Sequence, residues 1–129
     1  KISKPTQYLS ILLFLVMVIA SFSQNFKLFI THLHYICIIV LIHNACALAT
    51  GYFGAAAAKL PFKERKTLTL EVGIQNSGLG LILLFNQNIF PPEIWHGHYG
   101  GMLMITAWWG IWHIISGLTV STLFKRVKE

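Results

Sequence analysis

Hydrophobic residues run along this chain in four long blocks, and the polar residues gather mainly between the blocks. The blocks lack the three-to-four-residue spacing that marks a helix with one solvent-facing side. Their lengths lie near the roughly 20 residues that a helix needs to cross a bilayer. The pattern therefore predicts an all-α membrane protein whose four transmembrane helices occupy residues 6–23, 35–58, 67–90 and 99–124.

The first block allows a second interpretation because it is the shortest of the four. A secretory signal also has a basic start, here Lys1 and Lys4, an apolar core, and small residues such as Ser21 and Ser23. The chain does not begin with Met, which favours an internal fragment over a signal sequence.

Composition places the chain in a lipid bilayer rather than in solution. It is 55% hydrophobic and 11% charged, which excludes most soluble folds. The formal charge of +6 raises the question of nucleic-acid binding. However, the basic residues lie at the ends of apolar blocks and form no stripe with exposed aromatic residues, so no nucleic-acid partner is expected.

The basic residues also predict an orientation. If the chain crosses four times, residues 1–4, 59–66 and 125–128 share one side and carry every Lys and Arg except Lys27. Loops rich in Lys and Arg stay in the cytoplasm. We therefore expect a multi-pass protein of the cytoplasmic (inner) membrane with both ends cytoplasmic.

The third block, which contains LTLEVGIQNSGLGLILLF, is unusually polar for a membrane span. At 100° per residue, Glu71, Gln75, Asn76 and Ser77 cannot share one helix face. The block must be surrounded by protein or interrupted beside a cavity. Interruption is favoured by three glycines, each of which costs a helix interior about 1 kcal/mol relative to Ala: Gly73, Gly78 and Gly80.

An ionisable residue at membrane depth predicts a functional site. The span contains no Lys or Arg to pair with Glu71, so a cation from solution is one candidate partner. Carboxylate, amide and freed carbonyl oxygens together suit Na⁺. Two alternatives stay open: a protonated Glu71 that carries protons, and a carboxyl that only makes a structural hydrogen bond.

Two further blocks carry seams of small and polar residues. In the second block Ala47, Gly51, Ala55 and Ala58 predict a contact surface for the interrupted span, and His43 and Asn44 are expected as satisfied polar residues near the outer interface, or alternatively at the cavity. In the fourth block the seam favours close helix packing; its members are Thr106, Gly110, His113, Gly117 and Ser121.

Two histidine pairs, HLH at 32–34 and HGH at 96–98, fall in predicted outer loops. Residues two apart in an extended segment project to the same side, but two ligands are too few for a closed zinc site. No metal is expected there. The chain also lacks a nucleophile with a base at motif spacing and a phosphate-binding glycine loop, so no enzyme activity is expected.

The string EVGIQNSGL at 71–79, followed about forty residues later by WHIISG at 112–117, resembles the bile acid:sodium symporter family, in particular its bacterial members. The resemblance implies a secondary-transporter fold of about ten spans in two inverted repeats. Residues 1–129 would form the C-terminal portion of that transmembrane domain. The missing N-terminal half would then be a necessary partner.

The resemblance also implies a sodium site, with Na⁺ as the coupling ion. Glu71 would bind through its carboxylate and Gln75 through its side-chain amide, whereas Val72 and Ile74 would contribute backbone carbonyls.

The implied substrate-binding residues are Asn76, Ser77 and His113, and the substrate is a small organic anion, bile-acid-like or a small carboxylate. The family usually has Asn after the histidine. This chain has Ile114, which removes one polar contact.

These inferences predict sodium-coupled symport of an organic anion, by a fragment that alone transports nothing. The alternative is a self-contained four-helix protein that acts as a homodimeric proton-coupled carrier or as an accessory membrane subunit.

Overall fold

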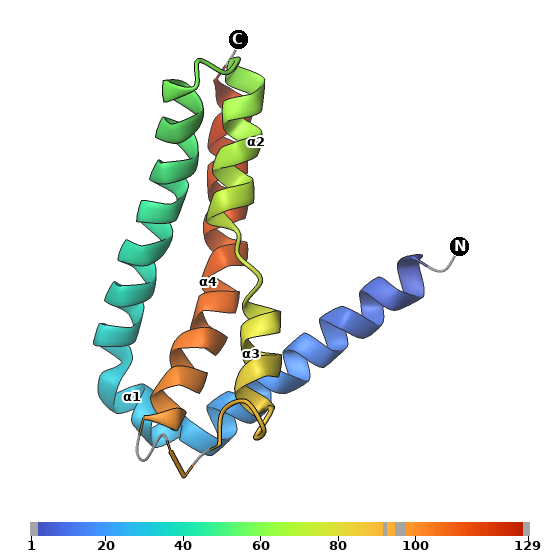
Figure 1. Cartoon of the computed structure of the whole chain (residues 1–129), viewed down its shortest axis with the longest axis vertical. Helices are drawn as coiled ribbons and strands as arrows, with labels where there is room; N and C mark the ends of the chain where they lie inside the picture. Colours follow the sequence, from blue (N-terminus) through green and yellow to red (C-terminus); the bar gives the residue numbers. More distant parts are fainter. Residues whose placement is uncertain (1–2, 92, 95–97, 128–129) are drawn as a thin grey trace. The chain divides into compact units, whose positions relative to one another are not determined.

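The computed structural model describes residues 3–91, 93–94 and 98–127. Over these residues the chain is helical and contains no strand, which confirms the all-α prediction. The helices follow one another along the chain (Figure 1) as α1 (Ser3–Ala57), α2 (Phe62–Gly73), α3 (Ser77–Phe85) and α4 (Tyr99–Arg126).

Three segments of the described chain are long and apolar enough to cross a membrane. They are α1, α2 together with α3, and α4. The predicted count of four is not confirmed, because the predicted spans 6–23 and 35–58 both lie in α1.

The loop expected between those two spans is helical instead. Residues 6–50 contain no Gly or Pro, and residues 26–34 are helical. α1 consists of two helical stretches joined at a kink at Asn25, which has a non-helical φ of −126° and ψ of 21°.

The turn between α1 and α2 is tight. The N–H of Leu60 donates to the carbonyl of Ala55 at 3.0 Å, and the N–H of Lys59 donates to that of Ala56 at 2.9 Å. Lys59 has a left-handed φ of 56°. This pattern is a Schellman motif, in which the left-handed residue ends one helix. Pro61 then stands at the N-cap of α2.

The chain divides into two compact units. The first contains α1 up to Ile36, α3, and α4 up to Trp108. Its core is formed by Phe29, Ile36 and Met104, with Phe22 packed edge-on against Phe29 at 4.6 Å between ring centres.

The second unit contains the rest of α1, α2 with residues 74–76, and α4 from Trp109. Here α1 and α2 approach closely at Gly51, where an added Cβ would lie 2.7 Å from the Leu68 carbonyl oxygen and 2.9 Å from the Thr69 Cα. Gly51 and Ala55 are buried, as the predicted seam requires, whereas Ala58 is exposed.

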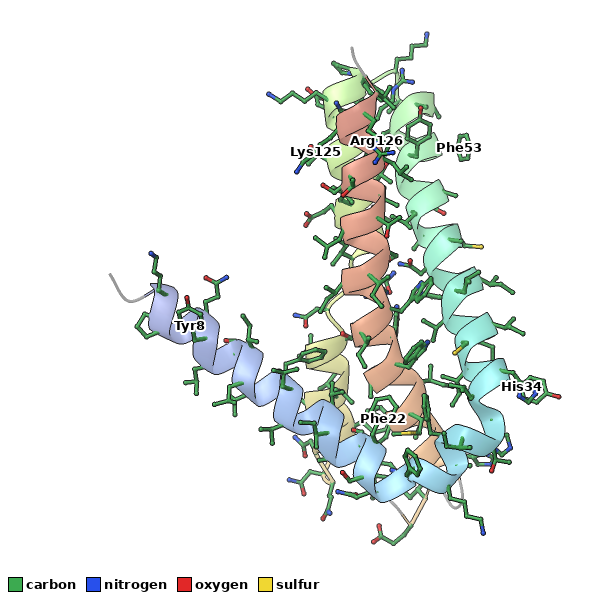
Figure 2. The ribbon with its side chains drawn as sticks, turned by 180° about the vertical axis from the view of Figure 1, so that it is seen from behind. Tyr8, Phe22, His34, Phe53, Lys125 and Arg126 are labelled. Atoms are coloured by element: carbon green, nitrogen blue, oxygen red, sulfur yellow. The ribbon has the colours of Figure 1, made fainter. Side chains whose placement is uncertain are left out.

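Many large apolar side chains point outward in both units. Figure 2 shows Tyr8 and Phe53 projecting from α1, with 71% and 67% of their surfaces exposed. Lys125 and Arg126 lie in the last turn of α4. An apolar exterior with charges at a helix end is what a lipid-embedded protein requires.

Gly51→Ala should destabilise the protein by about 1–3 kcal/mol, because the new methyl group meets backbone atoms of α2 that cannot move aside easily. Thermal unfolding in detergent measures the effect. Gly54→Ala is the matched control, since an added Cβ there has no atom within 4 Å. Equal unfolding temperatures for the two variants would contradict the close packing at Gly51.

Candidate functional site at the helix interruption

The polar third block is interrupted as predicted. α2 ends at Gly73, and α3 begins at Ser77 (Figure 1). Ile74 is extended, with φ −101° and ψ 92°, although its N–H still donates to the Leu70 carbonyl at 2.8 Å. Residues 74–76 therefore place non-helical backbone inside an otherwise apolar segment.

Side chains from two neighbouring helices bind the carbonyls at this interruption. The Nδ2 of Asn44, on α1, donates to the Gly73 carbonyl at 2.8 Å. The Nδ1 of His113, on α4, donates to the Gln75 carbonyl at 3.1 Å. Asn44 and His113 are 1% and 2% exposed, so both donor side chains are buried.

The bond to Gln75 determines the tautomer of His113. A carbonyl oxygen only accepts, so Nδ1 must carry the hydrogen. In a neutral ring Nε2 is then an acceptor, and this buried atom has no hydrogen-bond partner in the part of the chain that the structure describes. His113 therefore offers one unused acceptor beside the interruption.

A second histidine approaches the side chain of Gln75. The Nε2 of His43 lies 3.4 Å from Gln75 Oε1. The Trp109 ring contacts both histidines, with its centre 4.9 Å from that of His43 and 5.1 Å from that of His113. Gln75 is thus contacted from α1 through its side chain and from α4 through its backbone.

The four residues expected to bind sodium lie within the five-residue stretch 71–75 but are not enclosed. Glu71 lies in the last turn of α2 with an exposed side chain, and Val72 and Ile74 are 37% and 47% exposed. Gln75 is half-buried. The second unit therefore leaves one side of this group open.

Of the expected substrate residues, His113 lies beside the interruption. Asn76 is exposed at its end, and Ser77 is buried as the first residue of α3. Ile114 is 56% exposed, so it lies on a different side of α4 from His113.

The seam on α4 packs closely, as the sequence indicates. Gly110 and Gly117 are buried. An added Cβ at Gly117 would lie 2.6 Å from Ile74 Cδ1. The small residue at Gly117 thus makes room for the side chain of Ile74.

The structure places Asn44 and His43 beside the interruption rather than at a separate outer position. A position at the cavity was only the alternative prediction for these two residues, and Trp109 was not among the predicted site residues. A signal for Asn44 was present: it precedes Ala47, Gly51 and Ala55 by three, seven and eleven residues, which puts it on the same helix face as the seam.

The histidine pairs give less support for a functional site. His32 and His34 are helical rather than extended, so their side chains do not project to one side, and His96 lies outside the described residues. Within the described ranges no three His, Cys, Asp or Glu side chains come close enough to hold a metal ion.

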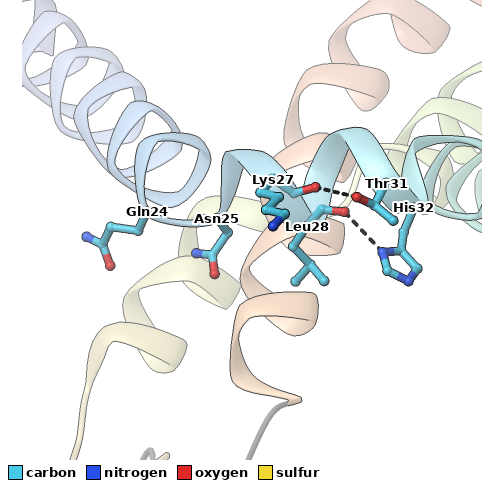
Figure 3. A pocket seen from close by; sticks show the side chains of 6 residues that line it. All are labelled: Gln24, Asn25, Lys27, Leu28, Thr31 and His32. Atoms are coloured by element: carbon cyan, nitrogen blue, oxygen red, sulfur yellow. Dashed lines mark hydrogen bonds between the residues drawn. The ribbon is translucent and has the colours of Figure 1, made fainter.

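An open pocket of about 410 Å³ lies along α1 near Asn25 (Figure 3). Thr31 and His32 bond to carbonyls of their own helix there, at 2.8 and 3.2 Å. The pocket is lined by Gln24, Asn25, Lys27, Leu28, Thr31 and His32.

Comparison with known proteins finds one informative similarity. The chain is 29% identical over 93 residues to an uncharacterized sodium-dependent transporter, YocS, of Bacillus subtilis (strain 168). The matched region covers 70% of this chain and 26% of that protein, so the chain spans about a quarter of the relative's length. No family model and no solved structure matches the chain significantly.

His113→Phe should destabilise the protein by about 1–3 kcal/mol, because a ring of similar shape is kept while the part-buried carbonyl of Gln75 loses its donor. Thermal unfolding in detergent provides the measurement. Ser116→Ala is the control, since the Ser116 hydroxyl bonds to a carbonyl of its own helix, that of His113. If His113→Phe unfolds at the same temperature as Ser116→Ala, the bond contributes nothing to stability.

Proposed function

We propose that this chain is the C-terminal portion of a sodium-coupled symporter for an organic anion. The observation that carries the proposal is the interruption at residues 74–76, which has Glu71 one helical turn before Gln75 and backbone carbonyls bound by neighbouring helices. Similarity to a protein named as a sodium-dependent transporter supports the same reading.

The proposed sodium ligands are the carboxylate of Glu71, the amide oxygen of Gln75, and the carbonyls of Val72 and Ile74. Interrupted helices supply such carbonyls to Na⁺ in several transporter folds. Because Glu71 is exposed, the remaining ligands come from elsewhere, and we assign them to an N-terminal half. The amide oxygen of Gln75 has two lone pairs, so contact with His43 leaves one for the ion.

The proposed substrate contacts are Asn76, Ser77 and His113. An organic anion needs hydrogen-bond donors near its carboxylate, which the amide and the hydroxyl supply. The unused Nε2 of His113 accepts instead, so it suits a hydroxyl or N–H group elsewhere on the same substrate.

In the membrane, we place both ends of the chain and the 59–66 segment in the cytoplasm, following the distribution of Lys and Arg. α1 then supplies two crossings, one before and one after Asn25, which keeps the count at four within an inverted-repeat fold.

In the proposed transport cycle, Na⁺ neutralises Glu71 and orders the interrupted segment. The anion binds next, and the two solutes cross together.

Glu71→Gln in the complete gene product should reduce anion uptake in proteoliposomes to the level measured without Na⁺, since the ion loses its charged ligand. Glu64→Gln is the matched control, because that glutamate lies in the first turn of the same helix and is also exposed. Sodium stimulation that survives in Glu71→Gln would show that this carboxylate is not a ligand.

The 129-residue chain reconstituted alone should transport no anion in the same assay, with or without Na⁺, because the site is open on one side. Uptake by this chain alone, insensitive to Na⁺ and driven by a proton gradient, would instead favour the self-contained proton-coupled carrier.

A further inference from the structure

We infer that Asn44 is a positioning residue for the sodium site: by holding the Gly73 carbonyl it aims the Ile74 carbonyl toward the ion. The inference rests on the proposed function, and it adds a residue that does not itself touch the ion.

The backbone loses hydrogen-bond partners where α2 ends. The last carbonyls of a helix have no partner within the helix. At membrane depth no water replaces that partner, and each unsatisfied group costs several kcal/mol. The Gly73 carbonyl is such a group, and Asn44 Nδ2 satisfies it at 2.8 Å.

Gly73 is held against α1 by two contacts. Leu48 lies one turn after Asn44 on α1, and its side chain occupies the space where a Cβ on residue 73 would stand. Gly73 and Asn44 are both buried. The same face of α1 therefore contacts Gly73 through an apolar side chain and binds its carbonyl through an amide, which leaves the peptide little freedom to rotate.

The position of the Gly73 carbonyl determines the direction of the next carbonyl, that of Ile74. An extended residue turns its carbonyl roughly opposite to that of the residue before it. Ile74 is extended, so fixing the Gly73 carbonyl against α1 directs the Ile74 carbonyl away from α1. His113 binds the following carbonyl, that of Gln75, at 3.1 Å. The peptide that presents the Ile74 oxygen is thus held on both sides.

Removing Asn44 should weaken Na⁺ binding by a predictable amount. Groups that orient a metal ligand without touching the metal typically change affinity by about 10–100-fold when they are removed. Asn44 orients one ligand among several, so the lower end of that range applies.

The test uses the complete gene product in proteoliposomes and compares Asn44→Leu, which keeps the size and removes the donor, with the unsubstituted protein. The half-saturating Na⁺ concentration should rise about tenfold, while the half-saturating anion concentration at saturating Na⁺ changes less than about twofold. A role confined to stability would lower the amount of folded protein and leave the half-saturating Na⁺ concentration unchanged.

Thr69→Val is the matched control. Thr69 is 3% exposed, lies on α2, and bonds through its hydroxyl to the Arg65 carbonyl of its own helix. The substitution removes a buried polar group of the same unit without touching the interruption, so the half-saturating Na⁺ concentration should not change.

If Asn44→Leu does not fold, Asn44→Gln keeps the amide but displaces it by one methylene, and it should still shift Na⁺ half-saturation more than anion half-saturation. Amide hydrogen exchange over residues 70–80 is the second measurement. It should accelerate in either Asn44 variant and remain unchanged in Thr69→Val.

The outcomes separate the two proposals. An unsubstituted protein without sodium stimulation overturns the proposed function and this inference with it. Sodium stimulation with the same half-saturating Na⁺ concentration in the Asn44 variants, or unchanged exchange over residues 70–80, overturns this inference alone.

Discussion

The second unit depends on one constraint: backbone carbonyls freed inside an apolar segment must find donors in the protein, because lipid offers none. Where α2 ends, Asn44 and His113 provide those donors from two different helices. Both donor side chains are almost fully buried. An interruption that would be unstable alone becomes a defined piece of backbone.

Close packing brings these donors within reach. Gly51 lets α1 approach the backbone of α2, and Gly117 makes room on α4 for Ile74. The small residues are therefore more than a generic packing surface. By reducing the separation between helices, they allow two short polar side chains to reach the main chain of a third segment.

The same arrangement explains how one segment can combine stability with chemistry. The carbonyls of Gly73 and Gln75 are bound by neighbouring helices, while Glu71 and Ile74 remain exposed. In our proposal, the bound carbonyls hold the frame and the exposed oxygens bind Na⁺.

The sequence alone determined the all-α class, the apolar spans and the interruption, because block length and the cluster of Glu71, Gln75, Asn76 and glycines are local properties. It did not predict that residues 24–34 are helical on both sides of a kink at Asn25, in a stretch that contains no Gly or Pro. The role of Asn44 and the contact of His43 with Gln75 were decided by tertiary structure. Which side chain reaches a freed carbonyl depends on how helices far apart in the sequence pack, and no local pattern encodes that distance.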